Sequence, residues 1–246
     1  MNNIRNGVIL AAGKGKRLNT NYKNILPKPL IPIGSKAIID YAMENLMKFG
    51  VSEYYIIVHY KKDLIQRYLK NNYGNFKIHF IYQKTLSGIG DAIYLTKQYI
   101  QREPFIVQLG DEIDIVENLE DFNKIFYEKH PSVINGSIYE PDLNVLKRTC
   151  EVNSDVTGKI LEMREKPMNP VYNHRGTGLY IFNDRIYEYI EKTPISSVRN
   201  EREITDTINI MSKDGNAYSI EMKGVSCNIN TLDDLRNARN RIANYI

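Results

Sequence analysis

The feature that most constrains the fold is an alternation, over the first 110 residues, of short apolar runs with segments in which apolar residues recur at helical spacing. The alternation predicts a parallel sheet, because a helix must carry the chain back before the next parallel strand can begin. We therefore expect an α/β, Rossmann-like fold with a mainly parallel mixed sheet and helices on both faces. The expected strands are 8–12, 53–59, 77–82 and 104–109, and the expected helices are 38–50, 61–72 and 90–100.

The second half of the chain is less regular. Thr231 is a candidate N-cap of the last helix, and Thr205 or Asp206 is expected to cap the helix before it, within the segment Glu203–Asp206. No repeat or linker is visible, so we expect a single domain, 1–246, with a nucleotide-binding half (about 1–130) and an acceptor-binding half that includes the final helix (about 131–246). Strands are expected at 133–139, 148–152, 160–164, 178–182 and 217–222, and helices at 185–192, 204–213 and 232–246.

Length and composition are those of an ordinary globular protein, with 246 residues, 42% apolar residues, 25% charged residues and a net charge of +4. Acidic and basic residues are interspersed outside the N-terminal segment, which argues against nucleic acid as a partner. No apolar run approaches the roughly 20 residues needed to span a bilayer, and the N-terminus leaves no room for a signal peptide, so no membrane partner is expected. Cys150 and Cys227 lack metal-binding spacing and favour a reducing, cytoplasmic location.

The first strand ends in a glycine-rich, basic turn that points to a phosphate-binding site. Residues 1–39 contain seven Lys or Arg and no Asp or Glu, so the positive charge is local. Glycines let the backbone approach a ligand closely, and backbone N–H groups with nearby cations favour a polyphosphate. The turn is not a Walker loop, since Gly15 follows Lys14, and it is not a dinucleotide fingerprint, since Leu18 stands where a third glycine is required.

Residues 10–18 (LAAGKGKRL) and 27–34 (PKPLIPIG) resemble the sugar-1-phosphate nucleotidyltransferases, or nucleotide-sugar pyrophosphorylases, and in particular the short single-domain glucose-1-phosphate thymidylyl- and uridylyltransferases. The resemblance continues to the C-terminus and implies the nucleotide-diphospho-sugar transferase type of fold. It also implies that the turn wraps the triphosphate of an NTP and that Arg17 and Lys28 stabilise the phosphates, with Lys28 close to the α-phosphate. The residues implied to hold the nucleotide are Leu10, Ala11, Ala12, Gly13, Lys14 and Gly15.

Two further segments carry the implied metal ligands. Asp111 follows an apolar strand in a Gly-Asp-Glu segment that resembles the family's Gly-Asp-Asn/Asp/Glu, and a carboxylate opposite a triphosphate is an expected Mg²⁺ ligand. The family's second ligand falls at Asn228, where the hexose thymidylyltransferases have an aspartate and some other relatives also have Asn. Asp111 and Asn228 are therefore the expected Mg²⁺ ligands, and Asp111 is grouped with Arg17 and Lys28 as a catalytic residue.

Gln83 and Gly88 match the pair with which thymidylyl and uridylyl members of the family read a pyrimidine. A Gln side chain offers one acceptor and two donors, which suits the edge of a base. Gly88 permits close approach of the backbone. UTP or dTTP is therefore expected ahead of CTP.

The acceptor half carries two motifs of the same family. Glu165 and Lys166 belong to a Glu-Lys-Pro motif, in which the Lys is implied to bind the acceptor's phosphate and the Glu a sugar hydroxyl. Thr177 and Gly178 belong to a Thr-Gly-Leu-Tyr motif near the acceptor. All four are expected to contact the substrate.

Arg148 is the main departure from the family. It stands about where hexose-specific members have a glycine against the sugar ring, and it is counted here among the substrate-binding residues. With His174 and Arg175 nearby, it favours a small or additionally acidic acceptor over an ordinary hexose.

The sequence is therefore expected to encode a Mg²⁺-dependent nucleotidyltransferase that transfers NMP from an NTP to a sugar 1-phosphate and releases pyrophosphate. No nucleophile motif calls for a covalent intermediate, and His59 and His79 are expected to pack at strand ends. One alternative is a cytidylyltransferase that uses CTP and a phosphorylated non-sugar of the phosphocholine or phospho-amide type. Another is a catalytically silent regulatory subunit, against which the presence of Lys28 and Asp111 argues. Self-association is common in the family, and its order stays open.

Overall fold

The structure is a computed structural model that describes residues 4–15, 18 and 25–245. Its contacts divide the chain into two compact units. The first unit consists of Met1–Leu86, Val107–Val116 and Gly224–Ile246, and the second consists of Ser87–Ile106 and Glu117–Lys223. In this division the final helix falls in the first unit, with the N-terminal strands.

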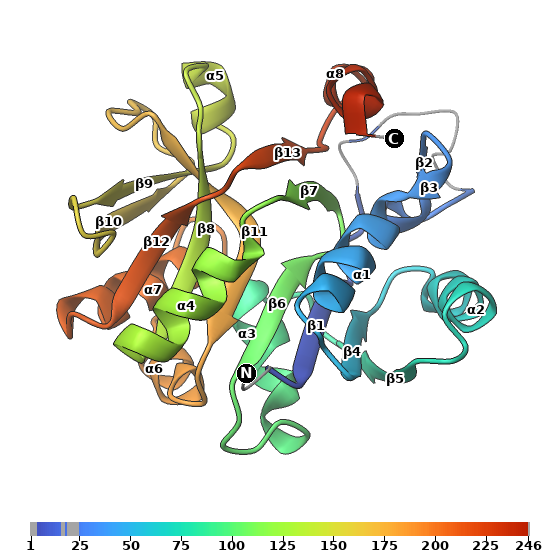
Figure 1. Cartoon of the computed structure of the whole chain (residues 1–246), viewed down its shortest axis with the longest axis horizontal. Coiled ribbons are helices and arrows are strands. Elements are labelled where there is room, and N and C mark those ends of the chain that lie inside the picture. Colours follow the sequence, from blue (N-terminus) through green and yellow to red (C-terminus); the bar gives the residue numbers. More distant parts are fainter. Residues whose placement is uncertain (1–3, 16–17, 19–24, 246) are drawn as a thin grey trace. The chain divides into compact units, whose positions relative to one another are not determined.

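A parallel sheet forms the centre of the first unit (Figure 1). Its strand order is β6 (Phe105–Leu109), β1 (Asn6–Ala11), β4 (Glu53–Val58) and β5 (Lys77–Tyr82), and the division between the units falls within β6. β1, β4 and β5 are parallel in continuous register. Every residue of β1 and β4 is buried, as expected for a parallel strand covered on both faces. The four strands confirm those expected from the sequence.

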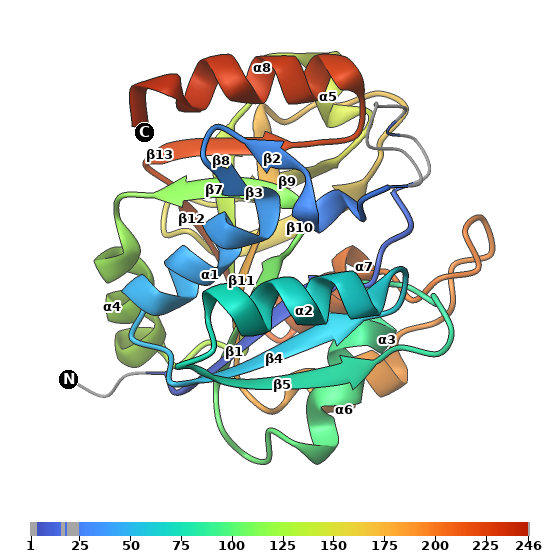
Figure 2. The same cartoon turned by 90° about the vertical axis from the view of Figure 1, so that its right-hand side faces the viewer.

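Two helices of the first unit are tied together by one carboxylate. The helix α1 (Ile38–Lys48) precedes β4 and the helix α2 (Lys62–Asn72) follows it, and Figure 2 shows α2 lying along β4 and β5. Asp40 caps α1 by accepting the Ala37 N–H at 2.8 Å, and it also accepts the hydroxyls of Tyr68 at 2.6 Å and Tyr73 at 2.9 Å. Burial, with the Asp40 carboxylate beside them, raises the pKa of both tyrosines.

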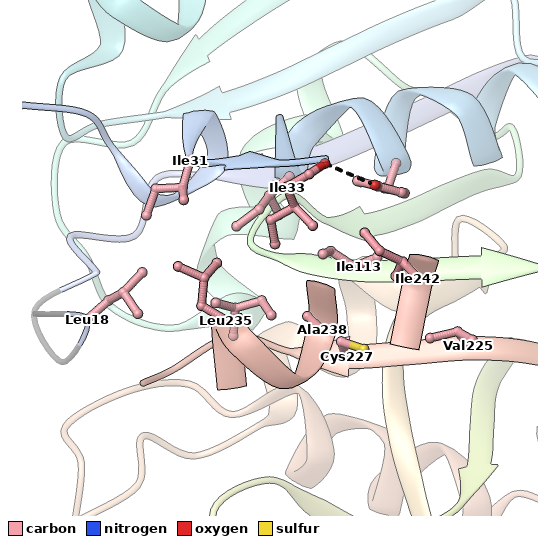
Figure 3. Close-up of a cluster of buried hydrophobic side chains, with 12 residues drawn as sticks. Leu18, Ile31, Ile33, Ile113, Val225, Cys227, Leu235, Ala238 and Ile242 are labelled. Atoms are coloured by element: carbon pink, nitrogen blue, oxygen red, sulfur yellow. Dashed lines mark hydrogen bonds between the residues drawn. The ribbon is translucent and has the colours of Figure 1, made fainter. Parts of the chain in front are cut away.

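A second core of the first unit lies between α1, two short ribbons and the final helix (Figure 3). The ribbons are β2 (Pro32–Ile33) with β3 (Lys36–Ala37), and β7 (Glu112–Val116) with β13 (Gly224–Asn228). The final helix α8 (Leu232–Ile242) ends in a 3-10 turn, Ala243–Tyr245, so it is shorter than expected. Its N-cap is Thr231, which confirms the prediction. The core residues are Leu18, Ile31, Ile33, Ile38, Tyr41, Ile113, Val225, Cys227, Ile229, Leu235, Ala238 and Ile242.

The second unit is built on mostly antiparallel strands. β11 (His174–Phe182) pairs with β8 (Val133–Tyr139) and β9 (Cys150–Ser154), and β9 pairs with β10 (Ile160–Glu165), all antiparallel. β12 (Ala217–Glu221) runs parallel to β8. The helices are α3 (Ile89–Tyr94), α4 (Leu119–Lys129), α5 (Leu143–Leu146), α6 (Ile186–Lys192) and α7 (Ile204–Lys213), with a 3-10 turn η2 (Leu95–Gln98) after α3.

Three local expectations need correction. The helix expected over 90–100 is α3 followed by the 3-10 turn η2. The N-cap of α7 is Glu203, whose φ of −75° and ψ of 135° are extended, and neither Thr205 nor Asp206 caps the helix because both already lie within it. The sequence also left out β7, β13, α4 and α5, which are short or weakly periodic.

The edge strand β10 is covered by a side chain. Asn209, on α7, accepts the Met163 N–H at 2.8 Å through its Oδ1 and donates to the Met163 carbonyl at 2.7 Å through its Nδ2. The amide thus takes the place of a neighbouring strand at an otherwise open sheet edge. Among the residues that the structure describes, no helix is long and apolar enough to cross a bilayer.

Candidate active site

The turn after β1 lies at the carboxyl end of the parallel strands, where ligands of such sheets bind. The side chains of Leu10, Ala11 and Ala12 are buried, so their backbone is what remains to face a ligand. Gly15 has a φ of +58°, and a Cβ added to it would lie 3.2 Å from the Lys28 Cβ, so a side chain there would be strained and crowded. A Cβ on Gly13 would meet no described atom within 4 Å, and Lys14 is exposed. Arg17 lies outside the described residues.

Lys28 and Asp111 are brought together although they are far apart in the sequence. Lys28 opens the 3-10 turn η1 (Lys28–Leu30), between Pro27 and Pro29. Its Nζ donates to the Asp111 Oδ2 at 2.9 Å, with 6% of the Lys28 side chain and 38% of the Asp111 side chain exposed. The pair therefore places a buried cation behind a more accessible carboxylate.

Gly110 explains how Asp111 reaches the end of β1. The Gly110 N–H donates to the Leu10 carbonyl at 3.0 Å, so the turn after β6 lies against the last residues of β1. A Cβ on Gly110 would lie 2.8 Å from the Ile9 Cγ2, closer than side-chain carbons pack. The glycine of the Gly-Asp-Glu segment is therefore required by this close approach, and it sets the position of Asp111.

Asn228, the last residue of β13, forms hydrogen bonds through both the nitrogen and the oxygen of its side-chain amide. It lies opposite Glu112 in the antiparallel register and donates its Nδ2 to the Glu112 carboxylate. Because a carboxylate accepts, the Asn228 Oδ1 must face the other way, and there it accepts from the Asn230 Nδ2. Glu112 was not among the residues singled out from the sequence. The signal that could have found it is its place beside Asp111.

Gln83 follows β5 directly and is almost fully buried. Its backbone N–H donates to the Val58 carbonyl at 3.0 Å, and its own carbonyl lies 2.7 Å from the His59 Nδ1. The His59 ring stacks on Tyr82 with centroids 5.7 Å apart. His59 does pack at a strand end, as expected. His79 lies within β5 and stacks on Tyr55.

Gly88, in the second unit, is required by packing against Arg202. Its φ is +109°, and an added Cβ would lie 2.6 Å from the Arg202 carbonyl oxygen. The Arg202 N–H donates to the Ser87 carbonyl at 2.8 Å, and the Gly90 N–H donates to the Arg202 carbonyl at 3.1 Å. A role for Gly88 in reading a base therefore stays a prediction, because this packing alone accounts for a glycine.

A cluster of charges in the second unit surrounds Glu165. Both the Lys166 Nζ and the Arg199 Nη1 donate to the Glu165 Oε1, each at 2.7 Å. Lys166 has a φ of +44°, and its N–H donates to the Thr149 carbonyl at 2.7 Å. Arg199 also pairs with Glu203 at 3.1 Å, while burial raises the pKa of Glu203. Sequence reasoning missed Arg199, which lies in an irregular segment with no periodicity.

Thr177 and Gly178 lie within an irregularity of β11. The register of β11 against β8 shifts between Gly176 and Tyr180. Within it, the buried Thr177 donates its Oγ1 to the Gly136 carbonyl at 3.1 Å. Bulges of this kind re-aim side chains and are frequent near functional sites.

Arg148 is exposed in the turn before β9, and its Nε donates to the Asn144 carbonyl at 3.0 Å. Arg175, by contrast, is only 1% exposed and lies in register with Ile138 of β8 and Glu151 of β9. Of the two arginines noted around the expected acceptor, Arg148 is thus solvent-facing and Arg175 is part of the sheet interior.

The first unit therefore presents a glycine turn, a buried lysine and a partly exposed carboxylate at the edge where α/β sheets bind ligands. A family model for nucleotidyl transferases matches residues 6–244, and the chain belongs to that family.

Relatives of known name agree with this assignment. The bifunctional protein GlmU of Methanocaldococcus jannaschii is 38% identical over 88% of this chain and 49% of its own length. The UTP–glucose-1-phosphate uridylyltransferase AglF of Haloferax volcanii is 28% identical over 96% of this chain and 95% of its own length. The chain spans about half the length of the GlmU relatives that it matches.

Solved structures show the same fold over nearly the whole chain. A putative glucose-1-phosphate thymidylyltransferase from Bacillus anthracis, in complex with sucrose, superposes with a TM-score of 0.84 at 25% identity, covering 96% of this chain and 94% of that chain. A UDP-glucose pyrophosphorylase in complex with UDP-glucose superposes with a TM-score of 0.86 at 24% identity, covering 99% and 100%. The α/β fold with a mainly parallel mixed sheet is therefore that of the nucleotide-diphospho-sugar transferases.

Proposed function

We propose that this protein transfers NMP from an NTP, with UTP or dTTP favoured, to a sugar 1-phosphate and releases pyrophosphate. The observation that carries the proposal is the ion pair between Lys28 and Asp111 at the end of β1 and β6. It provides a buried cation and a carboxylate beside a glycine turn, in a chain of the nucleotidyl transferase family.

In the proposed reaction, an oxygen of the acceptor's phosphate attacks the α-phosphorus of the NTP. A new P–O bond forms, the bond between the α-phosphorus and the bridging oxygen breaks, and pyrophosphate leaves with the electron pair. The attacking oxygen is already ionised at neutral pH, so no general base is needed. Catalysis then depends on positioning and on charge stabilisation, and Lys28 is suited to stabilise the α-phosphoryl group.

The residues of the first unit fit a Mg²⁺ ion. Mg²⁺ takes oxygen ligands and is held by one or two carboxylates together with substrate phosphates. Asp111 offers a partly exposed carboxylate, whose only hydrogen bond among the described residues is to Lys28, while Glu112 and Asn228 offer further oxygens. Asp111 with Asn228 would hold the ion. When bound, Mg²⁺ would neutralise charge on the nucleotide phosphates.

Different residues would bind the base of the nucleotide and the acceptor. Gln83 would read the pyrimidine through its side-chain amide, with Gly88 as the second predicted contact. In the second unit, Lys166 and Arg199 would bind the acceptor's phosphate, exchanging their present ion pairs with nearby glutamates for charge-assisted hydrogen bonds to the phosphate oxygens. Glu165 would then be freed to accept from a sugar hydroxyl.

The names of relatives support the same substrates. AglF matches along nearly its whole length and is named for UTP and glucose 1-phosphate. The two solved structures are named for glucose-1-phosphate thymidylyl transfer and for UDP-glucose. UTP with a hexose 1-phosphate is therefore the first pair to test.

The decisive test measures pyrophosphate release with Mg²⁺ across UTP, dTTP, CTP, ATP and GTP and a panel of sugar 1-phosphates, phosphocholine and phospho-amides. Asp111→Asn removes the charge of the proposed ligand. Asp63→Asn is the matched control, because Asp63 is exposed on α2. We expect release with UTP or dTTP and a sugar 1-phosphate, lost in Asp111→Asn and kept in Asp63→Asn.

Other outcomes would change the assignment. Release only with CTP and a non-sugar phosphate would replace the proposed substrates with those of a cytidylyltransferase. Nucleotide binding without release on any pair would favour a regulatory subunit. Full release in Asp111→Asn would remove Asp111 from the catalytic residues.

We also propose a cytoplasmic location. Cys150 and Cys227 are both free thiols buried in the protein, which suits a reducing compartment. Expression with a fluorescent tag in the source organism, followed by fractionation, would test it.

A further inference from the structure

We propose that His59 is a positioning residue that holds Gln83 in the orientation needed to read the base. The inference rests on the proposed function, in which the Gln83 amide contacts a pyrimidine. Nothing in the sequence pattern marked His59 for such a role, since a histidine at a strand end is usually a packing residue.

The backbone of Gln83 is anchored to two consecutive residues, Val58 at the end of β4 and His59 directly after it. Its N–H donates to the Val58 carbonyl at 3.0 Å, and its carbonyl lies 2.7 Å from the His59 Nδ1. Because a carbonyl oxygen can only accept, the Nδ1 of His59 must carry a proton and donate it. The contact thus continues the β4–β5 ladder past Tyr82, where β5 ends.

The imidazole is itself held in place. The His59 and Tyr82 rings are stacked 5.7 Å apart with an angle of 5° between their planes. The Lys62 Nζ lies 4.5 Å from the centroid of the Tyr82 ring, a cation–π contact. His59 therefore cannot turn its Nδ1 away from Gln83 without giving up the stack.

The side chain of Gln83 needs this support because it is poised for a ligand. Gln83 is 4% exposed, and the hydrogen bonds that it makes to described residues run through its backbone N–H and carbonyl, not through its side-chain amide. An amide can discriminate bases only if its donor and acceptor are aligned with the base edge, so a change in the backbone of Gln83 would weaken recognition.

The test compares His59→Leu, which removes the donor, with His59→Asn, whose amide nitrogen can stand near the position of Nδ1. Loss of one hydrogen bond predicts about a three- to tenfold rise in the KM for UTP in His59→Leu. His59→Asn should stay within about twofold of the wild type. The KM for the sugar 1-phosphate should not change in either variant.

A double-mutant cycle with Gln83→Leu separates positioning from a general structural role. If His59 acts through Gln83, His59→Leu should have almost no further effect on the KM for UTP in the Gln83→Leu background. An equal rise in both backgrounds, or a rise in His59→Asn as large as in His59→Leu, would overturn the proposal. If the proposed function is wrong, the wild type shows no turnover, and the double-mutant cycle is then measured with the Kd for UTP in place of the KM. Absence of UTP binding by the wild type would overturn the proposed function and the role of His59 together.

Discussion

Lys28 is a charged side chain at a depth where ordinary packing would favour an apolar one. Burial of an ammonium group is tolerated because the Asp111 carboxylate lies 2.9 Å away, and because the turn between two prolines holds the lysine in place. Asp111 keeps access to solvent, so removal of the lysine does not leave a buried charge without a partner. This asymmetry predicts a loss of activity that is larger than the loss of stability.

We expect Lys28→Met to lower kcat by at least about 100-fold, because a cation that stabilises developing charge is removed. The free energy of unfolding should change by no more than about 1 kcal/mol, since Asp111 can be solvated. Stopped-flow or coupled pyrophosphate assays and urea unfolding measure the two effects. Lys70→Met, on the exposed face of α2, is the control, and a kcat of Lys28→Met within threefold of the wild type would contradict the role of Lys28.

Asn228 allows a second residue-scale prediction, with a readout other than activity. In Asn228→Asp the donated hydrogen bond to Glu112 becomes a repulsion between two carboxylates. We expect the variant to melt at a lower temperature than the wild type without metal, and to regain stability when MgCl₂ is added. The measurement is thermal unfolding with and without Mg²⁺, and Asn240→Asp, exposed on α8, is the control. Equal melting in both conditions would argue against a cation at this position.

At the scale of elements, the chain is easiest to interpret where apolar periodicity is strong. β1, β4 and β5 carry apolar runs and pair in a parallel ladder, so their prediction was confirmed. β7 and β13 are five-residue strands that pair with each other across more than 100 residues, and neither carries a local signal strong enough to be noticed alone. The role of their apolar residues is seen only in the core of Figure 3, where they pack against α1 and α8.

The pair of hydrogen bonds from the Asn209 side chain to the backbone of Met163, on the edge strand β10, gives a prediction at this scale. Asn209→Ala would leave the N–H and the carbonyl of Met163 without their partner, at a residue that is only 2% exposed. We expect a loss of about 1–3 kcal/mol in the free energy of unfolding. Urea denaturation measures it, with Lys213→Ala on the same helix as the control. A loss below about 0.5 kcal/mol would mean that water replaces the amide at the edge.

At the scale of the whole molecule, the division into two units separates the predicted chemistry. Lys28, Gln83 and Asp111, which we propose to act on the nucleotide, belong to the first unit, whereas Lys166 and Arg199, proposed for the acceptor, belong to the second. The first unit is not continuous in sequence, because the end of β6, β7, β13 and α8 join the N-terminal strands. A boundary near residue 130 could not show this, since sequence order does not reveal which distant segments share a core.

Acid stability should reflect a network at the amino end of the parallel strands. Glu53 accepts from Lys77, and also from Arg5, and these contacts, Lys77 foremost, lower the pKa of Glu53 to about 2. Because the pKa is lower in the folded than in the unfolded state, the contribution to stability is present above about pH 4.5 and is lost as the pH falls towards 2.

We expect Glu53→Gln to reduce the free energy of unfolding by about 1 kcal/mol at pH 7, a modest value because Arg5 and Lys77 are solvent-screened. At pH 2 the variant and the wild type should be nearly equal. Urea unfolding across this pH range is the measurement. Glu120→Gln, in the first turn of α4, serves as a comparison for loss of charge alone, and a difference that persists at pH 2 would contradict the assignment.

The parts of this protein that depend on neighbouring residues could be predicted from its sequence. It was sufficient for the buried parallel strands, the glycine turn after β1, the Thr231 cap of α8 and the family, because periodicity, backbone freedom and capping act over a few residues. Which charges and amides become partners was visible only in the folded chain: Lys28 with Asp111, Asn228 with Glu112, and Arg199 with Glu165. The physical reason is that burial forces each polar group to find a partner, and which groups are buried side by side depends on the packing of segments far apart in the chain.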